Sequence, residues 1–233
     1  MNLGLRDEEL VELMDDPDCD PARLAATLRR FDLVNRLVSG WGTVYRTRMR
    51  PHLAGLGRPA RVLDLGSGGG DLVRRLAAAT RRDGLEVDVL GVDPDPRAHA
   101  VATGVTRHPG ERFECADAAA LVERGERFDV VVSNHVLHHL GDALPAVVDA
   151  SVELSRGIVL HGDIARGRLA YGLYAVGITP LAAGTFLRTD GLRSIRRSFT
   201  PDELRTALAD SPGAWRVSTP APFRVLAEGR GRA

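Results

Sequence analysis

The ten residues from Val62 to Asp71, VLDLGSGGGD, constrain the fold more than any other stretch of the chain. Val62, Leu63 and Leu65 surround a single aspartate, and such near-continuous apolar runs are typical of parallel strands that are buried on both faces. The glycines that follow let the backbone turn sharply and approach a ligand closely, because no Cβ atom intervenes. The sequence from Asp71 onward predicts a helix. The loop therefore opens onto a helix N-terminus, where nucleotide-bearing ligands bind in open α/β sheets.

Predicted strands and helices alternate from residue 61 to residue 163. This alternation by itself indicates an α/β fold with a parallel sheet and right-handed crossovers. Further strands are predicted at 86–92, 113–118, 128–134 and 157–163.

Length and charge narrow the class of protein. The 233 residues suffice for one sizeable α/β domain and are few for two. The 31 basic and 31 acidic side chains cancel, so no overall field attracts nucleic acid or an anionic membrane. Cys19 and Cys115 lack CxxC spacing, and the acidic, amphipathic start does not resemble a signal peptide. We expect a cytoplasmic protein with free thiols, monomeric or homodimeric, that acts on a small molecule.

Two segments outside the alternating region are predicted to cover the site. Helices are expected at 5–14, 21–39 and 43–53, which gives an N-terminal helical cap over residues 1–57 before a main domain at 58–233. Within that domain, an insertion at about 164–199 contains residues 169–187, which carry no charge. Pro180 and several glycines argue against a membrane helix there. We expect an apolar cap over the site, or a buried contact between subunits.

The glycine loop departs from the dinucleotide-binding pattern. Glycines fall at Gly66, Gly68 and Gly70, so the third comes one residue earlier than in GxGxxG, and Asp64 lies in the strand just before them. With the segments described next, this stretch resembles motif I of the class I S-adenosylmethionine (SAM) methyltransferases. The resemblance runs in order over residues 61–227. It implies SAM as the cofactor and a Rossmann-like three-layer sandwich, with a seven-stranded, mostly parallel sheet and an antiparallel hairpin at 215–219 and 223–227.

Three further segments fit this resemblance. Asp93 ends the second predicted strand, where a carboxylate can accept hydrogen bonds from both hydroxyls of a ribose. The resemblance implies that Asp117 bonds the adenine amino group and that the backbone beside it reads a ring nitrogen. Residues 128–140, FDVVVSNHVLHHL, resemble motif IV, whose strand ends at the transferred methyl group. The expected cofactor-binding residues are Asp64, Gly66, Ser67, Gly68, Gly70, Asp93, Pro94, Asp117, Ala118, Ser133, Asn134 and His135.

Histidines supply the candidate bases. Helical spacing places His135, His138 and His139 on one side of a turn. Without an HExxH pattern or an evident carboxylate ligand, no metal site is predicted. Imidazole, with a pKa of about 6.5, suits removal of a proton from a phenol or hydroxyl. We favour His138, because the matching position faces the active site in related small-molecule methyltransferases, and keep His139 and His161 as further candidates. His139 is alternatively a core histidine, and His161 a substrate anchor.

The acceptor is the least determined part of the prediction. Residues 31–35, FDLVN, with Ser39 and Arg46, resemble the YDxxN…S…WR stretch of quinone-biosynthesis C-methyltransferases, although Phe31 replaces the tyrosine. We expect methyl transfer to an aromatic or lipid-like acceptor, to oxygen rather than carbon, in secondary metabolism or quinone-type biosynthesis. A SAM-binding protein that catalyses another reaction, such as a cyclisation, would carry the same cofactor motifs. A nicotinamide-dependent oxidoreductase is disfavoured by the early third glycine and by Asp117.

Overall fold

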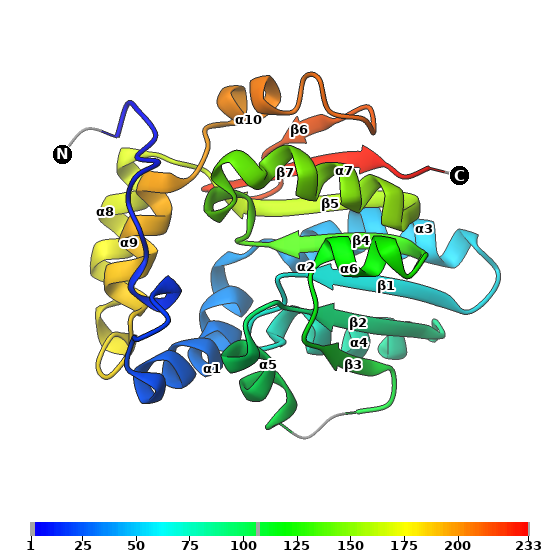
Figure 1. Ribbon diagram of the computed structural model, residues 1–233, viewed down its shortest axis with the longest axis horizontal. Helices are drawn as coiled ribbons and strands as arrows, with labels where there is room; N and C mark the ends of the chain where they lie inside the picture. The colour runs from blue at the N-terminus through cyan, green and yellow to red at the C-terminus, as the bar shows by residue number, and fades with distance from the viewer. Residues whose placement is uncertain (1–2, 106–107, 233) are drawn as a thin grey trace.

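A seven-stranded mixed sheet forms the centre of the computed structural model, which describes residues 3–105 and 108–232. The strand order is β3-β2-β1-β4-β5-β7-β6, in which the first five strands are parallel and the last two antiparallel (Figure 1). The predicted fold class is therefore confirmed. The strands are β1 (Ala60–Leu65), β2 (Val87–Val92), β3 (Glu111–Glu114), β4 (Phe128–Asn134), β5 (Ser155–Ile164), β6 (Arg216–Ser218) and β7 (Arg224–Arg230).

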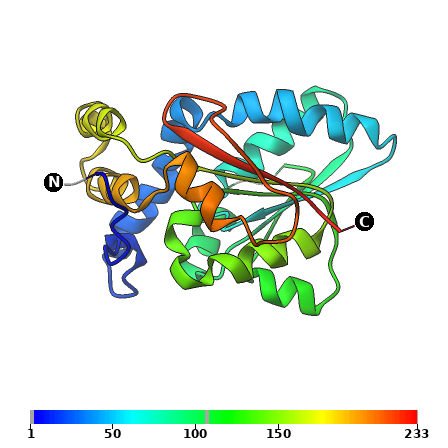
Figure 2. The ribbon, with the colours of Figure 1, turned by 90° about the horizontal axis from the view of Figure 1, so that it is seen from above.

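Helices cover both faces of the sheet, as Figure 2 shows from above. One apolar cluster joins β1 and β4 to α4 and to the helical run before β1. A second cluster joins the opposite face of the same strands to α6 and α7. These helices bury one stripe each because their apolar residues recur at helical spacing. Their bounds are α2 (Trp41–Val44), η2 (Tyr45–Met49, a π-helical turn), α3 (Arg50–Gly55), α4 (Asp71–Arg82), α6 (Ala118–Glu123) and α7 (Leu144–Leu154).

The register of the parallel strands positions the site. Leu65 at the end of β1 pairs with Val92 at the end of β2, and β4 pairs with β1 on the other side. The carboxyl ends of β1, β2 and β4 therefore meet at one edge of the sheet. Ligands bind outside such an edge where the strand order reverses, and in this sheet it reverses between β1 and β4.

The first segment of the chain differs from the prediction. No helix forms over residues 5–14. Residues 3–16, which we call the N-terminal strap, run along α9 (Leu187–Arg197) and contain only a 3-10 turn, η1 (Leu13–Asp15) (Figure 1). The backbone N–H groups of Leu13 and Met14 donate to Asp190 at 2.9 Å each. A helix would have used those donors internally, whereas here α9 provides the acceptor.

The second predicted helix is confirmed as α1 (Pro21–Val38). Its N-terminus is capped by Asp20, whose side chain accepts hydrogen bonds from two backbone N–H groups of the first turn, and Pro21 occupies the first helical position. α1 packs against α5 (Pro96–Thr103) and α4. It thereby lies across the carboxyl edge of the sheet and forms one wall above it.

The segment at 164–199 folds into two helices, α8 (Arg168–Gly177) and α9, joined through a 3-10 turn at Thr179–Leu181. They pack against each other beyond the carboxyl ends of the strands (Figure 1). Among the described residues, no helix is both long enough and apolar enough to cross a membrane.

The chain after β4 also differs from the prediction. Instead of entering a helix directly, it makes a left-handed turn at His135 (φ 63°) and two 3-10 turns, Leu137–His139 and Gly141–Ala143, before α7. Pro145 fits the second position of α7 but cannot continue a helix from upstream without losing a backbone donor.

The C-terminal part mostly follows the sequence pattern. α10 (Pro201–Ala207) carries the capping box of Thr200 and Glu203, and the closing hairpin forms as β6 and β7. The last strand is longer than the predicted 223–227, because β7 pairs with β5 as far as Arg230.

Candidate active site

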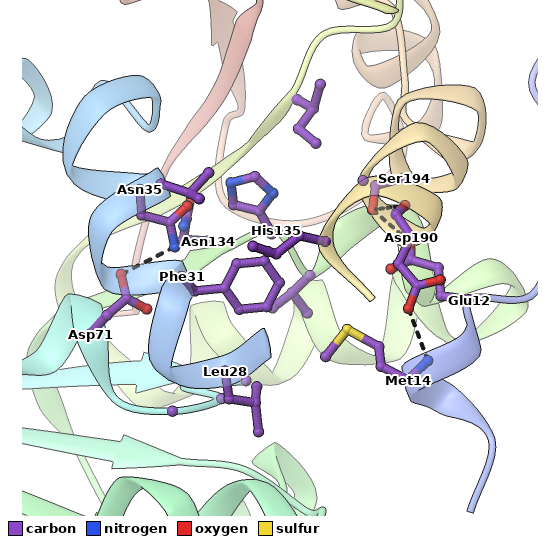
Figure 3. A pocket seen from close by; sticks show the side chains of 18 of the residues that line it. Glu12, Met14, Leu28, Phe31, Asn35, Asp71, Asn134, His135, Asp190 and Ser194 are labelled. Atoms are coloured by element: carbon purple, nitrogen blue, oxygen red, sulfur yellow. Dashed lines mark hydrogen bonds between the residues drawn. The ribbon is translucent and has the colours of Figure 1, made fainter. Parts of the chain in front are cut away.

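A cavity of about 840 Å³ lies at the carboxyl edge of the sheet. Its floor is the glycine loop and the ends of β1, β2 and β4. Its walls come from α1, α8, α9, the N-terminal strap and the start of β7. Figure 3 shows side chains from these elements converging on the cavity, with Phe31 and His135 near its middle.

The glycine loop turns because three of its residues adopt left-handed backbone conformations. Gly66 (φ 70°) has no room for a side chain, since an added Cβ would lie 2.6 Å from Val136 Cγ2. Gly68 (φ 52°) lines the cavity, and its N–H donates to Asp93 Oδ2 at 2.8 Å. Gly68 and Asp93 are 25 positions apart in the sequence, and their hydrogen bond joins the glycine loop to the tip of β2.

Two carboxyl groups border the loop. Asp93 lines the cavity; its Oδ1 accepts a hydrogen bond from the Asp95 N–H at 3.0 Å, and burial raises its pKa. Asp64 also lines the cavity, is 1% exposed, and its Oδ2 has no hydrogen-bond partner. Burial, together with the negative charges of Asp71 and Asp93, raises the pKa of Asp64 well above its usual range. An unpartnered buried oxygen of this kind is costly unless a ligand supplies its partner.

Asn35 connects α1 to this floor. Its amide Nδ2 donates to Asp71 Oδ2 at 3.1 Å at the start of α4, and both side chains line the cavity (Figure 3). Asn35 belongs to the FDLVN stretch, which resembles part of the quinone-biosynthesis C-methyltransferases. The contact fixes the position of α1 over the glycine loop.

His138 is held between two acids. Its Nδ1 lies 2.8 Å from Asp163 Oδ1, and its Nε2 lies 3.3 Å from Glu12 Oε1 without hydrogen-bond geometry. Burial opposes the charged imidazolium, but Asp163 and Glu12 outweigh burial and raise the pKa of His138 to about 9. His138 is therefore protonated at neutral pH. An imidazolium cannot accept a proton, which conflicts with the base role expected of His138.

His139 also lines the cavity, but it is more exposed than His138 and contacts a different pair of carboxylates. Its side chain is 28% exposed, Nδ1 lies 3.2 Å from Asp15 Oδ2, and Nε2 lies 3.7 Å from Glu12 Oε1. Asp15 and Glu12 both belong to the N-terminal strap. A carboxylate on Nδ1 orients an imidazole and fixes the tautomer that leaves Nε2 as the acceptor.

A third polar group surrounds Arg224 at the start of β7. Its Nη2 donates to Asn134 Oδ1 at 3.0 Å and to His135 Nε2 at 2.9 Å. Burial, followed by the positive charge of Arg224, lowers the pKa of His135 well below its usual range, so the imidazole is neutral and accepts this hydrogen bond. Burial lowers the pKa of Arg224 to about 10, which leaves the guanidinium charged at neutral pH.

The cavity brings together most of the predicted site residues. Those that line it are Asp64, Gly66, Ser67, Gly68, Asp93, Pro94, Asn134, His135, His138 and His139. Those that are not among its lining residues are Gly70, Asp117, Ala118, Ser133 and His161.

The residues outside the lining have structural partners. Asp117 is exposed and caps α6, since its side chain accepts from Ala120 N at 2.8 Å. Ala118 begins that helix. His161 is wholly buried and stacks on Trp215, and its two ring nitrogens lie within hydrogen-bond distance of the hydroxyls of Ser133 and Ser151. Burial lowers the pKa of His161 to about 4, so the ring is a neutral core histidine.

Sequence reasoning missed Glu12, Asp15, Asp190 and Arg224, all of which line the cavity. Three of these are ordinary acidic residues with no local motif. Arg224 offered one signal, because it is a lone charge within a predicted apolar strand, FRVLA. A buried charge in such a strand is rare without a partner or a role.

Glu12, His138 and His139 could hold a metal ion by geometry. One oxygen or nitrogen from each lies within 4.8 Å of the others. No metal site was predicted, because the sequence has no HExxH pattern and no evident carboxylate ligand beside the histidines. In the structure, Glu12 instead accepts a hydrogen bond from Ser194 Oγ at 2.8 Å and lies next to the protonated His138 (Figure 3).

The cavity, the glycine loop and Asp93 match the arrangement expected from the motifs. Residues 62–156 also match a family model described as a methyltransferase domain. Residues 62–156 therefore form a methyltransferase domain, as the resemblance to the class I SAM-dependent methyltransferases implies. This confirms the family resemblance inferred from the sequence.

Curated relatives of this methyltransferase chain include two ubiquinone biosynthesis O-methyltransferases. The protein from Chelativorans sp. is 29% identical over 161 residues, which cover 65% of this chain and 57% of the relative. The protein from Brucella anthropi is 31% identical over 159 residues, which cover 64% of this chain and 58% of the relative. The match thus spans under three fifths of each relative's length.

Solved structures share the fold across nearly the whole chain. The plantazolicin methyltransferase BpumL in complex with a monoazolic substrate analogue and S-adenosylhomocysteine (SAH) superimposes with a TM-score of 0.63 at 14% identity, covering 94% of this chain and 92% of that one. Human N-acetylserotonin methyltransferase in complex with SAM gives a TM-score of 0.65 at 13% identity, covering 92% and 57%. At these identities the likeness shows the fold.

Proposed function

We propose that this protein transfers the methyl group of SAM to a hydroxyl oxygen of a small aromatic or lipid-like acceptor. The observation that carries the proposal is a single cavity that contacts the glycine loop and Asp93 on one side and the apolar faces of α1 and α8 on the other. Its volume of about 840 Å³ is in the range of small-molecule sites and leaves room for two ligands side by side.

The residues on the floor fit SAM. Asp93, at the tip of β2, is placed to accept hydrogen bonds from the ribose hydroxyls. Gly66 and Gly68 let the loop backbone approach the ligand, and Asp64 Oδ2 lacks a partner that a polar ligand could provide. SAM, when bound, supplies an electrophilic methyl group and leaves as SAH. Gly70, Asp117, Ala118 and Ser133 remain expectations from the resemblance and are not part of this site.

The opposite side of the cavity favours an apolar acceptor. Phe31, Val34, Leu173 and Ile178 all line it, and Val34 packs with Ile178 in one apolar cluster against which Phe31 lies. These side chains exclude water from the acceptor while its reacting oxygen remains near the polar turn after β4. The curated relatives, named as O-methyltransferases, support oxygen as the atom methylated.

His139 is the proposed general base. Its Nε2 accepts the proton of the acceptor hydroxyl, and Asp15 holds the ring through Nδ1. His138 stays protonated and stabilises, through its positive charge, the negative charge that develops on the acceptor oxygen. Its partners Asp163 and Glu12 fix it in place rather than relay a proton.

The test is to supply purified protein with SAM carrying an isotopically labelled methyl group and a panel of phenols, catechols and quinols. We expect label in one product, attached to oxygen, with one SAH formed per product. Label attached to a carbon atom would show that the protein methylates carbon and not oxygen. Product without SAH would indicate a SAM-binding protein with another reaction. If the protein neither transfers the label nor binds SAH, the proposal is refuted.

A further inference from the structure

Arg224 is unusual among the arginines of the cavity wall. It lies at the start of β7, opposite Ile164 of β5, and only 4% of its surface is exposed. The hydrogen-bond partners of its side chain in the described chain are two neutral groups, Asn134 Oδ1 and His135 Nε2, both reached by Nη2. Its Nε is buried and has no hydrogen-bond partner.

A buried guanidinium normally pairs with a carboxylate, because moving a charge out of water costs several kcal/mol per ion. Arg166, also nearly inaccessible, follows that rule and pairs with Glu203. Over residues 3–105 and 108–232, no ion pair joins Arg224 to a carboxylate within 4.0 Å. Asp163 acts on Arg224 only through its field, since its oxygens already bond His138 and Ile164 N.

The surroundings of Arg224 do not neutralise it. The groups facing it across the turn after β4 are His135, which is neutral, and His138, which is protonated, with Asp163 shared between them. Holding Asn134 and His135 in place requires a donor but not a charge. Arg224 lines the cavity, and its positive charge has no carboxylate partner within 4.0 Å among the described residues.

We propose that Arg224 is an anion-binding residue of the cavity, which takes a carboxylate of a bound ligand. The guanidinium presents planar donors that match a carboxylate, and the buried setting strengthens each charged hydrogen bond. Two ligand carboxylates have this chemistry: one on an acidic acceptor, and the methionine carboxylate of SAM or SAH. The inference rests on the proposed function and deepens it.

The test compares two pairs of ligands by titration calorimetry on the full chain. The first pair is SAH and decarboxylated SAH. The second is 4-hydroxybenzoate and 4-hydroxybenzyl alcohol, measured with SAH already bound. We expect the wild-type protein to prefer the carboxylated member of at least one pair. Arg224→Gln should lower the affinity for that carboxylated ligand by about tenfold or more and change the affinity for the neutral ligand by less than about twofold.

Two further variants serve as controls. Arg224→Lys keeps the charge but not the planar donors, so its preference should lie between those of the wild type and Arg224→Gln. Arg230→Gln, at the exposed end of the same strand, should not alter either ratio. A purely structural Arg224 would weaken both members of a pair equally.

The outcomes separate the two proposals. Loss of the preference within the SAH pair assigns the anion to the cofactor, and loss within the benzoate pair assigns it to the acceptor. If the wild type binds SAH but prefers neither carboxylate, the anion site is refuted and the methyltransferase proposal stands. This comparison uses only the wild-type protein, so it does not depend on whether a variant folds. If the wild type binds none of the four ligands, both proposals fail.

Discussion

The two halves of the cavity are built in opposite ways. The half that we propose faces the cofactor comes from residues 64–95, a short stretch that lines the cavity with the glycine-loop backbone and the carboxyls of Asp64 and Asp93. The acceptor-facing half combines the N-terminal strap, the turn after β4, α9 and the start of β7, and it buries several charges. Local sequence determines the first half, while tertiary packing determines the second.

The electrostatics of the halves differ as well. Burial raises the pKa values of Asp64 and Asp93 on the cofactor side, and the negative charges of Asp71 and Asp93 raise the pKa of Asp64 further. On the acceptor side, His138 and Asp163 stabilise each other, so the pKa of the histidine rises and that of the carboxyl falls. The cofactor half thus leaves Asp64 Oδ2 without a partner, whereas in the acceptor half His138 pairs with Asp163, and Arg224 has no carboxylate partner among the described residues.

The largest expected effect tests the different roles that we propose for His139 and His138 on the acceptor side. His139→Gln should lower kcat for the best acceptor about 100- to 10,000-fold, because a positioned general base contributes that much. SAH affinity should stay within about twofold, because His139 is not proposed to bind the cofactor. The comparison variant is His108→Gln, which is exposed outside the cavity and should behave as wild type. Equal loss of SAH binding would move His139 into the cofactor half.

The next largest effect is the pH dependence of folding stability that the contacts of His138 with Asp163 and Glu12 cause. The pKa of His138 is raised from about 6.5 when unfolded to about 9 when folded, so the folded state binds more protons between these values. Its stabilisation is complete below pH of about 6.5 and is lost as pH rises through 9, a change on the order of 3 kcal/mol.

Urea unfolding at several pH values between 6 and 10 measures this loss. His138→Gln should flatten the fall in unfolding free energy over that interval, and His108→Gln should not. A wild-type stability that stays level up to pH 10 would show that His138 is not held as an imidazolium, and would restore it as a candidate base.

The cofactor half is tested by Asp93→Ala. Removing this carboxylate should weaken SAH on the order of 10- to 100-fold, through lost ribose hydrogen bonds and a loosened Gly68 N–H. Asp88→Ala is the matched control, since Asp88 lies on the same strand but pairs with Arg112 at the surface. If the two variants bind SAH equally well, the ribose assignment is wrong.

The smallest expected effect concerns Asp117, where the resemblance and the geometry disagree. Asp117→Ala should cost about 1 kcal/mol of stability through loss of the α6 cap. SAH affinity should change less than about twofold, because the side chain does not line the cavity. Calorimetry and thermal unfolding on one preparation measure both. A loss of affinity above tenfold would instead support the adenine contact that the resemblance implies.

The same contrast explains what sequence could predict. The glycine loop, Asp93 and the alternation of strands and helices follow from short-range patterns, since periodicity and turn chemistry are local. The strap could not be predicted, because its amphipathic pattern also fits a helix and only the acceptors on α9 decide against one. The roles of His138 and His139 depended on Asp163, Glu12 and Asp15. Spacing alone cannot show which carboxylates each of two adjacent histidines contacts.

The strap also bears on how the protein is made. Glu12 and its partner Ser194 are 182 positions apart, and Asp190 is separated from the strap by nearly as many. At ordinary rates of translation the strap is synthesised roughly 10 to 40 seconds before α9. The glycine loop and the first four strands can assemble in that interval. The base, its orienting carboxylate and the acceptor wall come together last, so a nascent chain acquires a cofactor pocket before it acquires the means to use it.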